Sequence, residues 1–147
     1  MHVEAVGAGV LVELLAVAVG ATLPLPPELR ITAALALLTV GLAGGYVAGR
    51  VAGGNWRDGI RHGLFAGVIG GGALALVLGY TMVTPGSEVG ALWGLNYLIA
   101  TSGLPSEFAA MYDQQLAILV PAVVGLLLAI EGALAGGAAG SVSVEPL

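Results

Sequence analysis

Four long apolar stretches dominate the chain, and each is bounded by proline, glycine or charged residues. A helix of about 20 apolar residues crosses the roughly 30 Å hydrocarbon core of a bilayer. Stretches of that length lie at residues 3–23, 29–52, 57–83 and 115–140. The pattern predicts an all-α integral membrane protein, a single domain over residues 1–147 with four transmembrane helices.

The boundaries of the first three spans follow from helix-ending residues. Prolines end the first span, because their rings cannot continue a helix and their missing N–H groups suit the start of the next; these are Pro24, Pro26 and Pro27. The second span ends at Gly53 and Gly54. Asn55 is expected to cap the third helix, with Asp58 three residues later.

Residues 87–112 fit neither a span nor a plain loop. Ser87 can cap a short helix over residues 88–101, whose tryptophan and tyrosine rings suit the water–membrane boundary. Pro105 begins a second helix-start pattern, and the helix that it predicts can continue into the last span with a kink at Pro121. The segment is predicted to form an interfacial cap or a partly re-entrant piece.

The arginines predict the orientation, because short loops rich in basic residues stay in the cytoplasm. Arg50, Arg57 and Arg61 surround the turn between the second and third spans, whereas residues 84–114 carry acidic residues and no basic one. Arg30 alone opposes this assignment. We therefore expect a multi-pass protein of the cell membrane with both termini in the cytoplasm.

Glycine recurs at every fourth position in the second and third spans. Four glycines on one helix face let a second backbone approach closely, which is how helices associate in lipid. The two series are Gly41, Gly45, Gly49 and Gly53, and Gly59, Gly63, Gly67 and Gly71. They flank one turn and are predicted to face each other as a close-packed antiparallel hairpin, a glycine zipper. A shorter series in the last span, Gly132, Gly136 and Gly140, lies at the same level and can join this layer as a third helix.

The segment GLAGGYVAGRVAGGNWRDGIRHGLFAGVIGGG, with its paired glycine series around a short polar turn, resembles a family of small four-helix membrane proteins of unknown function from halophilic archaea. The resemblance covers residues 29–83, and the glycine-rich end of the last span adds to it. It implies an integral membrane protein and supplies no catalytic residues. The absence of lysine and the acidic excess agree with a halophilic source.

Glu13 stands in the centre of the first span, where an ionised carboxylate costs about 2.5–3.5 kcal/mol on insertion scales. Its side chain is therefore expected to face protein, next to the small residues Gly9, Ala16 and Gly20. At similar depth the second span offers the hydroxyl groups of Thr39 and Tyr46 as donors, and no arginine. Glu13 is either a proton- or cation-binding carboxylate or a neutral group hydrogen-bonded between helices.

Glu131 is the second carboxylate inside a predicted span, about four residues to the cytoplasmic side of its centre. Arg50 and Arg61 lie deeper on that side, so either can form an ion pair with Glu131. The alternative is a second station of a proton or cation path that starts at Glu13.

Composition excludes several other functions. The chain is 58% hydrophobic and 9% charged, with 25 glycines, four basic residues and net charge −5, and its mean hydropathy is +1.00. Such a balance does not favour nucleic-acid binding, and the lack of cysteine removes thiol chemistry. His2 and His62 lack clustered carboxylates for a metal site, and His62 is expected to contact lipid headgroups.

Two functions remain open. The first is a structural or accessory membrane protein without catalytic activity or cofactor, whose glycine faces mediate homo-oligomerisation or assembly into a larger complex in the lipid. The second is a small proton- or cation-conducting transporter or channel subunit that uses Glu13 and Glu131.

Overall fold

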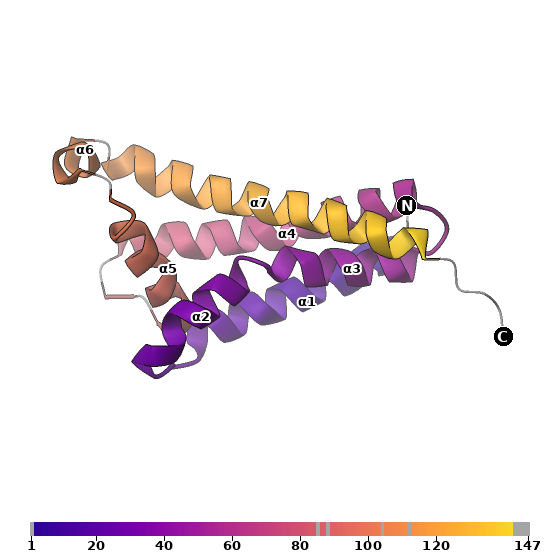
Figure 1. Ribbon diagram of the computed structural model, residues 1–147, viewed down its shortest axis with the longest axis horizontal. Coiled ribbons are helices and arrows are strands. Elements are labelled where there is room, and N and C mark those ends of the chain that lie inside the picture. The colour runs from indigo at the N-terminus through magenta and orange to yellow at the C-terminus, as the bar shows by residue number, and fades with distance from the viewer. Residues whose placement is uncertain (1, 85, 88, 104, 112, 143–147) are drawn as a thin grey trace.

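The computed structural model describes residues 2–142 except 85, 88, 104 and 112, and within these the chain forms helices and no strand. The helices are α1 (Val3–Thr22), α2 (Pro27–Leu37), α3 (Val40–Ala52), α4 (Trp56–Val83), α5 (Gly90–Ala100), α6 (Ser106–Met111) and α7 (Asp113–Ser141). Figure 1 shows an elongated bundle in which α1 begins and α7 ends at the same end.

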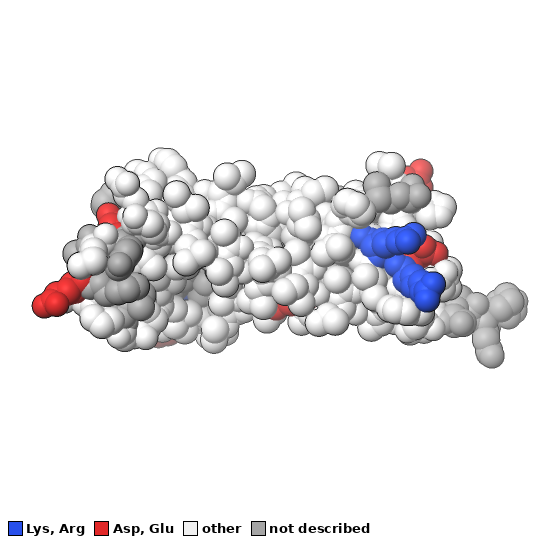
Figure 2. Space-filling model, turned by 90° about the horizontal axis from the view of Figure 1, so that it is seen from above, with Lys and Arg blue, Asp and Glu red and all other residues white. Residues whose placement is uncertain are grey.

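Three helices, α1, α4 and α7, are long and apolar enough to cross a membrane. A fourth crossing exists if α2 and α3 together count as one span, since the pair passes the same test but bends by 42° at its junction. Figure 2 shows most of the charged side chains gathered toward the two ends of the bundle, and the wide band between them is uncharged apart from a small acidic patch at its lower edge. The fold is that of a multi-pass membrane protein.

The second predicted span, residues 29–52, is therefore not one continuous helix. It breaks between Leu37 and Val40, where both the backbone N–H and the hydroxyl of Thr39 donate to the carbonyl oxygen of Ala36, at 3.1 Å and 2.9 Å. A threonine side chain that bonds to a nearby carbonyl competes with regular helix hydrogen bonding. Glycines at 41, 44 and 45 then weaken the helix that follows.

The start of α4 follows the sequence prediction. Asn55 caps this helix, with its side-chain oxygen accepting from the backbone N–H groups of Arg57 at 2.9 Å and Asp58 at 3.2 Å. Ser87 does not cap α5, because its hydroxyl donates to the carbonyl oxygen of Thr84 and the helix begins only at Gly90.

Helix α5 lies across one end of the bundle and packs mainly on α2 (Figure 1). Gly94 lets its backbone approach α2, since a Cβ there would lie 2.9 Å from that of Ala34. On the outside, the Arg30 guanidinium lies 4.9 Å from the centre of the Trp93 ring, which stacks on Tyr97. Aromatic rings with a nearby arginine, as at Trp93 and Tyr97, are typical of the boundary between membrane and water.

The two glycine series do not face each other, which corrects the predicted hairpin contact. Helices α3 and α4 are antiparallel neighbours, but the glycines of both approach the backbone of α7. A Cβ on Gly45 would meet the backbone of Gly132, and so would a Cβ on Gly63 from the other side. Glycine spacing marks the face of a helix that packs closely, and here α7 supplies a third face of the same kind.

The remaining members of the series behave alike, with one exception. A Cβ would meet backbone atoms of α7 at Gly41, Gly49, Gly59, Gly67 and Gly71. Gly53 has nothing within 4 Å of its Cβ position and instead ends α3 with φ +62°. Its role is therefore a left-handed helix end rather than helix packing.

Candidate functional site

Glu13 lies in the interior of the bundle, midway along α1. Its side chain is 0% exposed, although glutamate is almost never fully buried unless it is paired. Neither carboxylate oxygen has a hydrogen-bond partner among the described residues. The side chain thus combines full burial, an apolar helix and unsatisfied acceptors.

Two glycines make the space for this carboxyl group. A Cβ on Gly44 of α3 would lie 2.6 Å from Glu13 Cδ, and a Cβ on Gly70 of α4 would lie 2.5 Å from Glu13 Cβ and 2.7 Å from Cδ. Any larger residue at either position would displace the carboxyl. Glu13 therefore occupies a slot between α3 and α4 that exists because both helices lack a side chain there.

Sequence reasoning missed Gly44 and Gly70. Each lies directly before a glycine of the predicted series, Gly45 and Gly71. Adjacent helical residues point about 100° apart, so a doubled glycine serves two neighbours at once. At both positions one glycine contacts α7 and the other contacts Glu13, and this doubling was the available signal.

The hydroxyl groups expected to bond to Glu13 point elsewhere. Thr39 donates to the carbonyl oxygen of Ala36 at the α2–α3 break, and the Tyr46 side chain is half exposed on the outside of α3. Both side chains are exposed, whereas the face of α3 that contacts α1 carries Gly44 and Ala48.

Glu131 approaches α3 from the opposite side. It is half-buried on α7, one residue before Gly132, which packs on Gly45. Because Gly44 contacts Glu13 and Gly45 contacts the α7 turn that bears Glu131, the two carboxyl groups lie at the same level of the bundle with α3 between them.

The start of α3 packs along the α7 turn that bears Glu131, since Gly41 meets Leu128 and Gly45 meets Gly132. The backbone N–H of Leu42 donates to the carbonyl oxygen of Thr39 at 3.1 Å, and Oε2 of Glu131 is buried without a hydrogen-bond partner in the described part of the chain. Backbone N–H groups at a helix start favour negative charge nearby. The break between α2 and α3 therefore places a helix start beside the α7 turn that bears Glu131.

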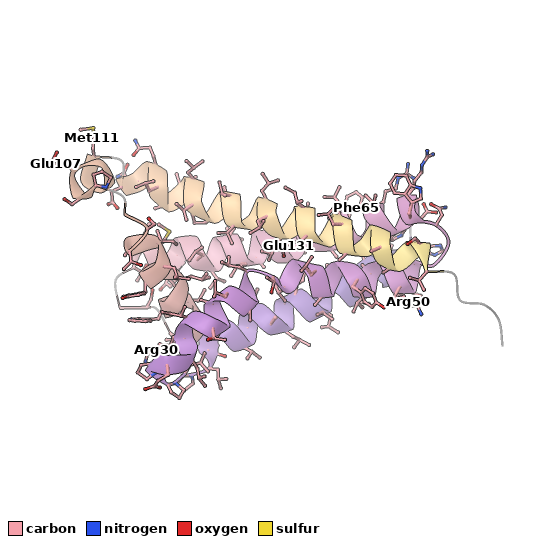
Figure 3. The ribbon with its side chains drawn as sticks, viewed as in Figure 1. Arg30, Arg50, Phe65, Glu107, Met111 and Glu131 are labelled. Atoms are coloured by element: carbon pink, nitrogen blue, oxygen red, sulfur yellow. The ribbon has the colours of Figure 1, made fainter. Side chains whose placement is uncertain are left out.

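The predicted ion pair of Glu131 with Arg50 or Arg61 is absent from the described residues. Arg50 donates to the carbonyl oxygen of Val142 at 3.2 Å, and both arginines are exposed. Figure 3 shows Glu131 in the middle of the bundle and Arg50 at its end. The arginine side chains stay with the polar end of the bundle because the interior near Glu131 is apolar.

His62 is buried, which corrects the predicted headgroup contact. Its side chain is 3% exposed, and its Nδ1–H donates to the carbonyl oxygen of Asp58 at 2.6 Å while Nε2 accepts from the backbone N–H of His2 at 2.8 Å. The two histidine rings stack with centroids 5.9 Å apart. His62 thus fastens the start of α1 to α4.

An open apolar groove of about 1080 Å³ lies between α4 and α7, and Gly72, Leu76, Tyr80, Ile118 and Pro121 help to line it. Neither intramembrane carboxyl group lines it. Among the described residues, no three metal-ligating side chains come together. The chemistry of the bundle interior is therefore concentrated at Glu13 and Glu131.

No protein-family model, curated protein or solved structure matches the chain. The resemblance of residues 29–83 to the halophile family stays a prediction.

Proposed function

We propose that the protein is a small proton or cation carrier of the cell membrane, with the Glu13 carboxyl group as its binding group. One observation carries the proposal: a fully buried carboxyl in the middle of an apolar helix, with both oxygens unpartnered among the described residues. An unsatisfied buried polar group costs about 1–3 kcal/mol. A purely structural residue at this position would be apolar or would have a donor.

Two further features support the proposal. Ionisable residues within membrane-spanning helices commonly belong to proton relays and ion pathways. Helices that break within the membrane frequently form transporter binding sites, with helix starts directed at anionic groups, and α3 starts beside the α7 turn that bears Glu131. In this proposal Glu131, on the other side of α3 from Glu13, is the second carboxylate of the path.

The orientation belongs to the same proposal. Three arginines lie at the end where α3 and α4 meet, and Arg30 lies at the opposite end (Figure 3). The excess of basic residues favours the α3–α4 end as the cytoplasmic side. Both termini then lie in the cytoplasm as well.

An assembly role through the glycine faces has less support. Seven of the eight glycines of the two series pack against α7 of the same chain, so they are not free to contact another protein. A structural or accessory role would need another surface, such as the groove between α4 and α7.

Proton flux into sealed vesicles tests the proposal. The protein is reconstituted into liposomes that contain a pH-sensitive dye, and a membrane potential is imposed with potassium and valinomycin. Glu13→Gln is expected to lower the flux by about tenfold or more, because an amide does not take up a proton. The matched control is Glu28→Gln, which changes an exposed glutamate at the start of α2 and should leave the flux unchanged.

Sodium and potassium gradients in the same vesicles distinguish a cation from a proton. Wild-type flux of either cation that Glu13→Gln abolishes would assign a cation. Equal flux through the wild type and Glu13→Gln for all three ions, with both proteins folded, would refute the carrier function.

A further inference from the structure

The core differs on the two sides of Glu13. Toward α5, the buried side chains that surround α1 are large aliphatic ones, namely Val17, Leu37, Leu74, Leu78 and Leu92. Toward the arginine end, the three helices around Glu13 meet through glycine and alanine. We define the small-residue seam as Ala5 and Gly9 of α1, Gly44 and Ala48 of α3, and Ala66 and Gly70 of α4.

Contacts in the seam are direct and continuous. A Cβ on Gly9 would lie 2.5 Å from the carbonyl oxygen of Gly44 and 2.9 Å from the Cβ atoms of both Ala48 and Ala66. Gly9 thus contacts α3 and α4 at once, one turn from Glu13. The fully buried, unpartnered Glu13 carboxyl forms the inner end of the seam between Gly44 and Gly70.

A polar pocket marks the outer end of the seam. It has a volume of about 240 Å³ and is lined by His2, Asp58, Arg61 and His62 together with glycines of the α3–α4 turn. His62 and Gly70 are eight residues apart on α4, so the pocket lies about 12 Å from Glu13 by helical rise. Figure 1 shows α1, α3 and α4 meeting at this end of the bundle.

We infer that Glu13 exchanges its proton or cation with the arginine end of the bundle, through transient opening of the small-residue seam. The seam is lined by glycine and alanine, so a small displacement of α1 from α3 and α4 leaves no large side chain between the pocket and Glu13. Opening also uncovers the Gly44 carbonyl oxygen, which can accept a hydrogen bond from water or bind a cation. The ion then moves between the pocket and the Glu13 carboxylate.

His62 keeps this route closed. Its ring holds the start of α1 against α4 through the bond from the His2 backbone N–H. Loss of that bond lets α1 move away from the seam. The inference rests on the proposed function, because access to Glu13 matters only if the residue binds an ion.

Thiol labelling tests the route without measuring flux. The chain contains no cysteine, so each variant has a single thiol. Ala66→Cys and Ala48→Cys place it in the seam on two different helices, and Leu74→Cys places it on the aliphatic side. Arg57→Cys and Glu107→Cys, at exposed positions near the two ends, report which side a charged, membrane-impermeant methanethiosulfonate reaches.

Seam cysteines should react from the side that labels Arg57→Cys, and Leu74→Cys should react from neither side. Adding His62→Ala should raise the labelling rate of Ala66→Cys several-fold. Protection of both seam cysteines in folded protein, or labelling of Leu74→Cys from the Glu107 side, would overturn the route. If Glu13→Gln loses flux but the seam cysteines are protected, only the route is refuted. If the seam cysteines are labelled but Glu13→Gln keeps the flux of the wild type, the carrier function is refuted.

Discussion

Alanine in place of Gly63 tests the close approach of α4 and α7. A Cβ at this position would lie 2.9 Å from the carbonyl carbon of Gly132 and 3.0 Å from Cα of Gly136, besides its contact with the Gly132 oxygen. Ordinary contacts of a Cβ lie at 3.4–4 Å. Backbone atoms cannot rotate aside as a side chain does, so the two helices must separate at this point.

The expected loss of stability follows from this geometry. Overpacking costs about 1–3 kcal/mol, and the upper part of that range applies because α7 cannot retreat. Gly132 is also in contact with Gly45 of α3, so a shift away from α4 compresses that second interface. Alanine gains up to about 1 kcal/mol over glycine in a helix. The net loss of unfolding free energy for Gly63→Ala is therefore about 2 kcal/mol.

Unfolding in mixed detergent micelles measures this loss. Sodium dodecyl sulfate is titrated while the fluorescence of Trp56 and Trp93, the two tryptophans of the chain, reports the transition. Gly72→Ala is the matched control on the same helix, because its Cβ would have nothing within 4 Å. The control should match the wild type or exceed it slightly. Equal stability of Gly63→Ala and Gly72→Ala would refute the close contact of α4 with α7.

Three further substitutions test other parts of the structure. Glu13→Met should raise the unfolding free energy by about 1–3 kcal/mol, since it removes unsatisfied acceptors at similar volume, and a loss of stability would mean that the carboxyl has a partner. Asn55→Ala should lower stability by about 1 kcal/mol in the same titration by removing the α4 cap, and an unchanged midpoint would contradict that role. Trp93→Leu should lower stability by about 0.5–2 kcal/mol, because it removes the cation–π contact with Arg30, and it should speed proteolysis near α5. An unchanged cleavage rate would show that the Trp93 ring does not hold α5 on α2.

Much of the helical framework could be predicted from the sequence, because it depends on local signals. The lengths of the apolar stretches predicted α1, α4 and α7, and Asn55 as a capping residue predicted where α4 starts. The insertion cost of a charge in the first span indicated that Glu13 faces protein. These inferences need only the residues of one helix and the properties of the bilayer.

Features that depend on several helices could not be predicted. Glycine periodicity identifies a close-packing face but not its partner. The last span was expected to join a hairpin of the two series, whereas Gly45 and Gly63 do not face each other and both pack on it, as α7. The break at Thr39 arises from one side-chain bond within an apolar run. His62 is adjacent to Arg61 in sequence and looked exposed, but the start of α1 covers it.

Reaction of the unmodified protein with a lipophilic carbodiimide tests the central claim, that Glu13 is the ion-binding group, most directly. The reagent enters the bilayer and attaches to carboxylic acids there, and mass spectrometry of peptides locates the adduct. Our account predicts that the adduct forms on Glu13 and that the fraction of labelled molecules equals the fraction of flux lost. Full flux in protein labelled at Glu13, or blocked flux without label at Glu13, would contradict it.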